Sequence, residues 1–158
     1  MTTDLAGELD VLPEPAPPAL LDLPDVNLLV ALLHPAHVHH LQAQAWFTSV
    51  ERFATTPITE SGFIRMALNP AVAGQVTSLD DAMSSLNSVR ADKRVEYVAD
   101  DTSLALPTID LVGLVGFRQV TDFHLVNLAA CHSARLVTFD RKLAPTLAPE
   151  DRRFVHSL

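Results

Sequence analysis

The sequence predicts an α/β domain in three layers, with a central parallel sheet between two layers of helices. Short strand-like runs alternate with longer helix-like stretches from residue 19 onward. This order requires crossover connections, which make neighbouring strands parallel and place helices on the faces of the sheet. A length of 158 residues and an apolar content of 48% suit one packed core. We therefore expect residues 19–158 to form one domain.

Each expected element follows from a local pattern. Apolar and β-branched runs predict strands at 19–23, 52–55, 94–98, 135–139 and 153–156. Apolar residues at helical spacing predict helices at 26–33, 36–50, 58–68, 79–90, 104–115 and 123–132. We expect Thr56 to cap a helix whose first residue is Pro57, and Thr121 to cap the last of these helices. Pro35 and Pro70 should end the helices before them.

Residues 1–18 differ from the rest of the chain in composition. They are acidic and rich in proline, and prolines at that density prevent both a helix and a central strand. We expect a loose, solvated tail in this segment. The formal net charge of −8 argues against a broad basic surface for nucleic acid. However, residues 1–24 contain acids and no Lys or Arg, so the remainder is closer to neutrality.

The sequence also suggests a cellular location. It contains neither a positively charged start followed by an apolar segment nor an uninterrupted apolar run of about 18 residues. We therefore expect a protein that is neither exported nor membrane-spanning. Cys131 is the only cysteine, which excludes an internal disulfide and suits the reducing cytoplasm. Its place in an apolar helix predicts a small core residue.

Four acids stand near the ends of expected strands or in the first turn of expected helices, where ligands bind in open parallel sheets: Asp25, Glu60, Asp122 and Asp140. The helix after Asp122 runs away by about 16 Å at ~1.5 Å per residue, and the next strand returns about 16 Å at ~3.3 Å per residue. Asp140 should therefore come back level with Asp122. A single acid at such a position is also explained as a helix cap.

Four acids on one edge have a more specific explanation than capping. Clustered carboxylates repel one another unless a cation or a proton neutralises them. Oxygen ligands suit Mg²⁺ or Mn²⁺, which retain waters that a phosphate oxygen can replace. Such an ion activates water and stabilises the charge of a phosphodiester transition state. The pattern therefore predicts a metal site for phosphodiester chemistry.

Four segments resemble, in order and spacing, the motifs of VapC-type PIN-domain toxins: LPDVNLLVALLHPAHVHH, PITESGFIRMALNPAV, GFRQVTDFHLVNLA and ARLVTFDRKL. The resemblance covers roughly residues 20–143. It implies a PIN-like fold with a metal site at Asp25, Glu60, Asp122 and Asp140. Asn27 and Thr138 fall where relatives often have polar support for that site. Phe117 departs from the pattern, since relatives often have His there.

The resemblance implies a function as well. It predicts a metal-dependent endoribonuclease toxin that cleaves RNA with a metal-activated water, is held inactive by a cognate antitoxin and forms a homodimer. A non-catalytic PIN-like module that binds RNA or protein is the alternative, although all four acids are present. A haloacid-dehalogenase-like phosphatase or a phosphoreceiver fits less well, because PDVN lacks the second Asp of the former and no central Asp with a late Lys indicates the latter.

Two further groups of side chains have candidate roles. Four basic residues near the acidic motifs are candidate RNA contacts: Arg65, Arg118, Arg141 and Lys142. Four histidines could suggest zinc, but no cysteine accompanies them and a solvated helix start is the simpler explanation: His34, His37, His39 and His40. Trp46 and Phe47 should be core or dimer contacts. No motif identifies the RNA target.

Overall fold

A computed structural model describes residues 19–74 and 76–158, so the expectation for residues 1–18 lies outside the described residues. The predicted parallel sheet is confirmed, with five strands in the order β3-β2-β1-β4-β5 and every neighbouring pair parallel. The strands are β1 Leu21–Pro24, β2 Phe53–Thr55, β3 Val95–Tyr97, β4 Ala134–Thr138 and β5 Val155–Ser157. β1 lies at the centre, and its carboxyl end leads directly into Asp25.

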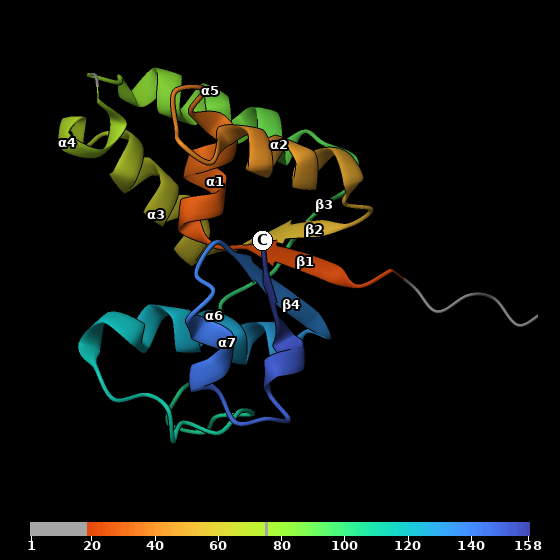
Figure 1. Cartoon of the computed structure of the whole chain (residues 1–158). Coiled ribbons are helices and arrows are strands. Elements are labelled where there is room, and N and C mark those ends of the chain that lie inside the picture. Colours follow the sequence, from red (N-terminus) through yellow and green to blue (C-terminus); the bar gives the residue numbers. More distant parts are fainter. Residues whose placement is uncertain (1–18, 75) are drawn as a thin grey trace, which may run out of the picture.

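Helices cover both faces of the sheet, which confirms the three layers (Figure 1). On one side lie α1 Val26–Leu33, α2 His40–Ser49, α3 Pro57–Ala67, α4 Pro70–Ala73 and α5 Leu79–Arg90. On the other side lie α6 Val120–Cys131 and α7 Leu143–Thr146. Two short 3-10 turns cover Phe117–Gln119 and Arg152–Phe154. In the described part of the chain, no helix combines the length and the apolar character of a membrane span.

The two helical layers pack on opposite faces of the same strands. In β4, Leu136 belongs to the core cluster beneath α6, with Phe123 and Leu128. The next residue, Val137, belongs to the cluster on the opposite face, with Trp46 and others. A strand buried on both faces is continuously apolar, which is why the runs in the sequence located the central strands.

Helix caps decide where the helices next to the strands begin. The hydroxyl of Thr56 accepts from the backbone N–H of Thr59 at 3.3 Å, and Pro57 is the first residue of α3, as predicted. The prediction for Thr121 was wrong, because α6 begins at Val120, so that Thr121 lies inside the helix, and α6 has no side-chain cap. Helix α2 begins at His40 and not at residue 36, because residues 36–39 form turns after Pro35.

The predicted helix at 104–115 was wrong, since this segment consists of turns. Distant side chains take the hydrogen bonds that a helix would have made: the N–H of Thr108 donates to Asn127 Oδ1 at 2.7 Å, and the N–H of Asp110 donates to Asp151 Oδ2 at 2.8 Å. The segment packs along α6. Cys131 was wrongly assigned to the core, because it is exposed, with its Sγ 3.0 Å from Thr108 Oγ1.

Gly113 allows this segment to approach α7. A Cβ at Gly113 would overlap the backbone carbonyl of Thr146. Gly113→Ala should therefore force the two backbones apart and lower the free energy of unfolding by about 2 kcal/mol. Thermal unfolding followed by circular dichroism measures the change. Gly116→Ala is the matched control, since its new Cβ would lie 3.7 Å from the nearest atom, Gln119 Oε1. Equal melting temperatures for the two variants would contradict this packing.

Candidate metal centre

Asp25 is fixed by two elements at the end of the central strand. Its backbone N–H donates to the carbonyl of Val137 at 3.0 Å, which joins it to β4. Its Oδ1 accepts from the N–H of Leu28 at 2.7 Å, so Asp25 is the N-cap of α1. The side chain is buried. Asp25 therefore caps α1 through Oδ1, and its carboxylate lies at the carboxyl end of β1, where the sequence predicted a metal ligand.

Thr138 connects Asp25 to Asp140 at the end of β4. The Thr138 Oγ1 accepts from the N–H of Asp140 at 2.9 Å. Burial raises the pKa of Asp25, and a hydrogen bond with the Thr138 side chain opposes that rise. Asp140 Oδ1 accepts from the N–H of Lys142 at 2.8 Å, which turns the chain after the strand. The buried hydroxyl of Thr138 thus contacts both acids.

Asp122 lies in the first turn of α6, partly buried and within electrostatic range of the other two acids. Burial first, and then the negative charges of Asp25 and Asp140, raise the pKa of Asp122 to about 6. Burial and the charge of Asp140 also raise the pKa of Asp25, against the opposing hydrogen bonds. The structure therefore places Asp25, Asp122 and Asp140 within electrostatic range of one another. The charge of Glu60 is not among those that shift either pKa, and the role of all four acids as metal ligands stays a prediction.

Glu60 lies on α3 and has different partners. Its Oε1 accepts from the Thr55 hydroxyl at 2.6 Å and lies 3.5 Å from Arg90 Nε. Arg90 also donates to Thr55 Oγ1 at 3.1 Å. The sequence analysis did not identify Arg90 or Thr55. An Arg in the last turn of a helix looks like ordinary dipole compensation, so no signal in the sequence pointed to it.

The other predicted side chains lie on the surface. Asn27, Arg65, Arg118, Arg141 and Lys142 are all exposed, and α1, α3 and the segments beside the acids carry them. Arg141 Nε donates to the carbonyl of Leu158 at 3.1 Å, and Arg118 lies over the ring of Phe117, 5.6 Å from its centre. Their contact with RNA stays a prediction.

The chemistry of the donors suits a hard divalent cation. The charges of Asp25 and Asp140 raise the pKa of Asp122, and the charge of Asp140 raises that of Asp25, so negative charge is concentrated at this edge. Mg²⁺ and Mn²⁺ prefer such oxygens and complete their coordination with water. Among the described residues, no group of three or more His, Cys, Asp or Glu side chains is arranged so that it could hold a metal ion by itself. An ion at this edge would therefore be held by one or two of these carboxylates and would complete its coordination with waters and a substrate oxygen.

The histidines lie on another part of the surface and have other partners. His34 Nε2 is 2.6 Å from the carbonyl of Ala73, and His40 Nδ1 is 2.8 Å from the carbonyl of Ala31. The ring of His39 stacks on Phe139. These contacts hold the turn before α2 against the domain and give no support to a zinc site.

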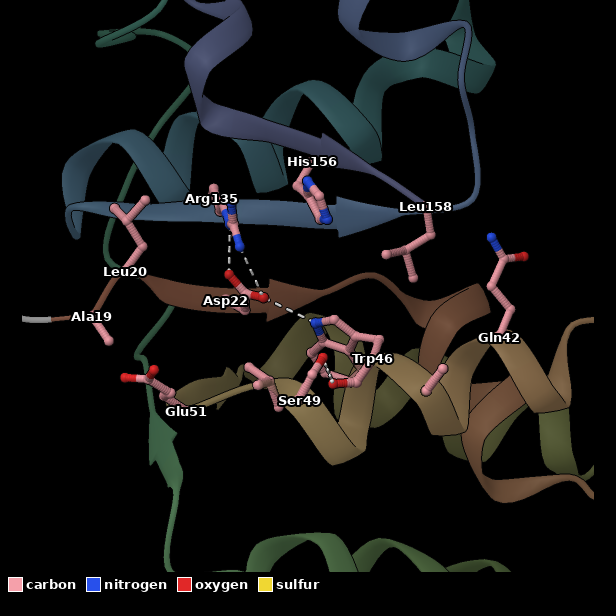
Figure 2. Close-up of a pocket in the computed structure, with 12 residues that line it drawn as sticks. Ala19, Leu20, Asp22, Gln42, Trp46, Ser49, Glu51, Arg135, His156 and Leu158 are labelled. Atoms are coloured by element: carbon pink, nitrogen blue, oxygen red, sulfur yellow. Dashed lines mark hydrogen bonds and ion pairs between the residues drawn. The ribbon is translucent and has the colours of Figure 1, made fainter.

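A cavity of about 540 Å³ lies between α2 and strands β1, β4 and β5 (Figure 2). At its wall, buried Asp22 accepts from Trp46 Nε1 at 2.9 Å and from Arg135 Nε at 2.7 Å. None of the four candidate acids lines it. Trp46 is thus a core residue with a satisfied indole N–H, as one of its predicted roles required. We assign this network to packing between α2 and the sheet.

Comparison with known proteins identifies the family, although no protein-family model matches the chain. Ribonuclease VapC38 of Mycobacterium tuberculosis is 44% identical over 118 residues, which cover 73% of this chain and 82% of that protein. The chain belongs to the VapC family of PIN-domain ribonucleases. Ribonuclease VapC39 is 42% identical over 76% of this chain and 88% of that protein, and ribonuclease VapC44 is 38% identical over 79% and 89%, both from the same organism.

Structural comparison supports the same VapC fold. The crystal structure of M. tuberculosis VapC20, described as a sarcin-ricin loop cleaving toxin, matches with a TM-score of 0.50. The match covers 75% of this chain and 87% of VapC20 at 8% sequence identity. At that identity the likeness concerns the fold alone, and the predicted PIN-like α/β architecture is confirmed.

Proposed function

We propose that this VapC-family chain is a metal-dependent endoribonuclease, the toxin of a toxin–antitoxin pair. The observation that supports it best is the group of Asp25, Asp122 and Asp140 at one edge of the sheet, where the pKa of Asp122 rises to about 6. A charged carboxylate with a raised pKa destabilises the folded protein, so its presence here is better explained by a function such as metal binding than by stability. A family of ribonucleases supplies the reaction class.

In this proposal Asp25, Asp122 and Asp140, with Glu60, hold Mg²⁺ or Mn²⁺. When bound, the ion activates water and offsets the charge of the phosphodiester. Thr138 keeps Asp25 and Asp140 in register through its hydroxyl. Asn27 is a supporting residue at the same edge, and the exposed bases Arg65, Arg118, Arg141 and Lys142 are candidate contacts for the RNA backbone.

The proposed partners follow from the family. We expect a cognate antitoxin that holds the enzyme inactive, and a homodimer of the toxin. The relatives are named as ribonucleases, and VapC20 is described as cleaving the sarcin-ricin loop. The target of this chain need not be the same, because loop contacts read RNA by shape and by exposed bases.

Metal removal tests the proposed reaction. Purified protein with Mg²⁺ or Mn²⁺ should cut single-stranded or loop RNA into fragments that end in a 3′-hydroxyl, and excess EDTA should stop cleavage. Gel electrophoresis of end-labelled RNA measures both. Undiminished cleavage in EDTA would contradict the metal-dependent reaction. Binding of RNA with no cleavage under any metal condition would instead support the non-catalytic binding module.

A further inference from the structure

Arg90 forms an ion pair with Glu60, one of the four candidate metal ligands. This is the one described ion pair that includes any of these acids. Arg90 ends α5, and its Nη1 donates to Thr55 Oγ1 at 3.1 Å. Thr55 in turn donates to Glu60. The guanidinium is therefore held in a fixed orientation beside the proposed metal centre.

Tyr97 lies next to Arg90 at the end of β3. It pairs in register with Thr55 of β2, and Arg90 Cζ lies 4.8 Å from the centre of its ring. Yet 52% of Tyr97 is exposed, so packing uses only part of the ring. The Arg90 side chain is 36% exposed, and its Nη2 group has no hydrogen-bond partner among the described residues. An aromatic face and available N–H donors thus stand side by side at the edge of the site.

This pair matches one nucleotide of a single strand. A guanidinium recognises a phosphate through paired N–H donors, and an exposed aromatic ring stacks on a base whatever its identity. The contacts with Glu60 and Thr55 use Nε and Nη1 of Arg90, so they leave Nη2 and the exposed part of the Tyr97 ring without a described function in the fold. Arg90 also supplies positive charge where phosphate oxygens must approach an acidic centre.

We propose that Arg90 and Tyr97 form a subsite for one unpaired nucleotide of the RNA, in which Tyr97 stacks on the base and Arg90 contacts the adjacent phosphate. The inference rests on the proposed ribonuclease function and adds a requirement for an unpaired base beside the cleaved bond. In a duplex the base faces are covered by their neighbours, so double-stranded RNA cannot use this subsite.

The first test uses Tyr97 as a reporter, since it is the only tyrosine of the chain. In protein with ring-labelled tyrosine, the single Tyr97 signal should shift upfield when a single-stranded RNA tetranucleotide is added in EDTA, where the proposed cleavage does not occur. A duplex of the same sequence should leave the signal unchanged. No shift with the single strand, in protein that cleaves RNA with Mg²⁺, would overturn the subsite and leave the ribonuclease function standing. Protein that neither cleaves RNA nor shows the shift would overturn both.

The second test separates binding from chemistry. Tyr97→Leu and Arg90→Gln should each raise KM for single-stranded RNA about tenfold and change kcat by less than about threefold. Tyr97→Phe keeps the aromatic face and should stay near wild type. Arg52→Gln is the matched control, because Arg52 directly precedes β2, pairs with Glu96 of β3 at 2.6 Å and is similarly exposed. A fall in kcat with unchanged KM in Arg90→Gln would show that Arg90 only positions Glu60, which would overturn the subsite.

Discussion

Asp25→Asn, Asp122→Asn and Asp140→Asn should each reduce kcat for RNA cleavage by about 100-fold or more, because each change removes a charged ligand from the proposed metal centre. An amide has nearly the shape of a carboxylate, so the fold should persist. Single-turnover cleavage at saturating Mg²⁺ measures the effect, and circular dichroism checks folding.

Asp22→Asn is the matched control for these variants. Asp22 is another buried aspartate; it lies in β1, three residues before Asp25, and its partners are Trp46 and Arg135. Losing its charge opposite Arg135 should lower stability. The cleavage rate of the folded protein should change little. If the three site variants cleaved RNA as fast as Asp22→Asn, the assignment of the metal ligands would be wrong.

Asp122→Asn should stabilise the metal-free protein at pH 7. The ordinary pKa of the carboxyl is 3.8, and burial with the charges of Asp25 and Asp140 raises it to about 6 in the folded state. At neutral pH the folded protein must therefore hold an unfavourable charge. A shift of that size corresponds to about 3 kcal/mol. Because Asp122 is only partly buried, solvent screening should reduce the gain in the free energy of unfolding to on the order of 1 to 2 kcal/mol, or about 3 to 6 °C in the melting temperature.

The pH dependence has a definite sign. The folded state binds the proton of Asp122 more tightly than the unfolded chain does, so this group should make the metal-free wild type less stable as the pH rises from about 4 to about 6. Below that range both states are protonated and the penalty is absent. Asp122→Asn should flatten this part of the stability curve, whereas Glu150→Gln, an exposed acid elsewhere, should not.

Titration with Mn²⁺ completes the stability measurement. Binding to the folded state alone raises stability with ligand concentration, so wild type should gain and Asp122→Asn should gain much less. Scanning fluorimetry in EDTA and in Mn²⁺ measures both effects. A variant that lost stability in EDTA and still responded normally to Mn²⁺ would show that Asp122 supports α6 and does not belong to the metal site.

The sequence by itself determined where the strands lie along the chain and why acids that follow those strands should meet at one edge of the sheet. Strands buried on both faces must be apolar throughout, so β1, β2 and β4 were visible as runs. Parallel strands bring their carboxyl ends to one edge of the sheet. Asp25 follows β1 and Asp140 follows β4, so the two acids were expected close together although they are far apart in sequence. The Thr56 cap was equally local, since its bond reaches only three residues along the chain.

Only the tertiary structure decided what depends on contacts between distant segments. Residues 104–115 carry a helical pattern, yet Asn127 and Asp151 capture their backbone N–H groups and hold them in turns. The pairing of Glu60 with Arg90 and the high pKa of Asp122 likewise arise between separate elements. Hydrogen bonds, burial and charge interactions depend on which residues are close in space. Local sequence propensity does not predict which distant side chains will make these contacts.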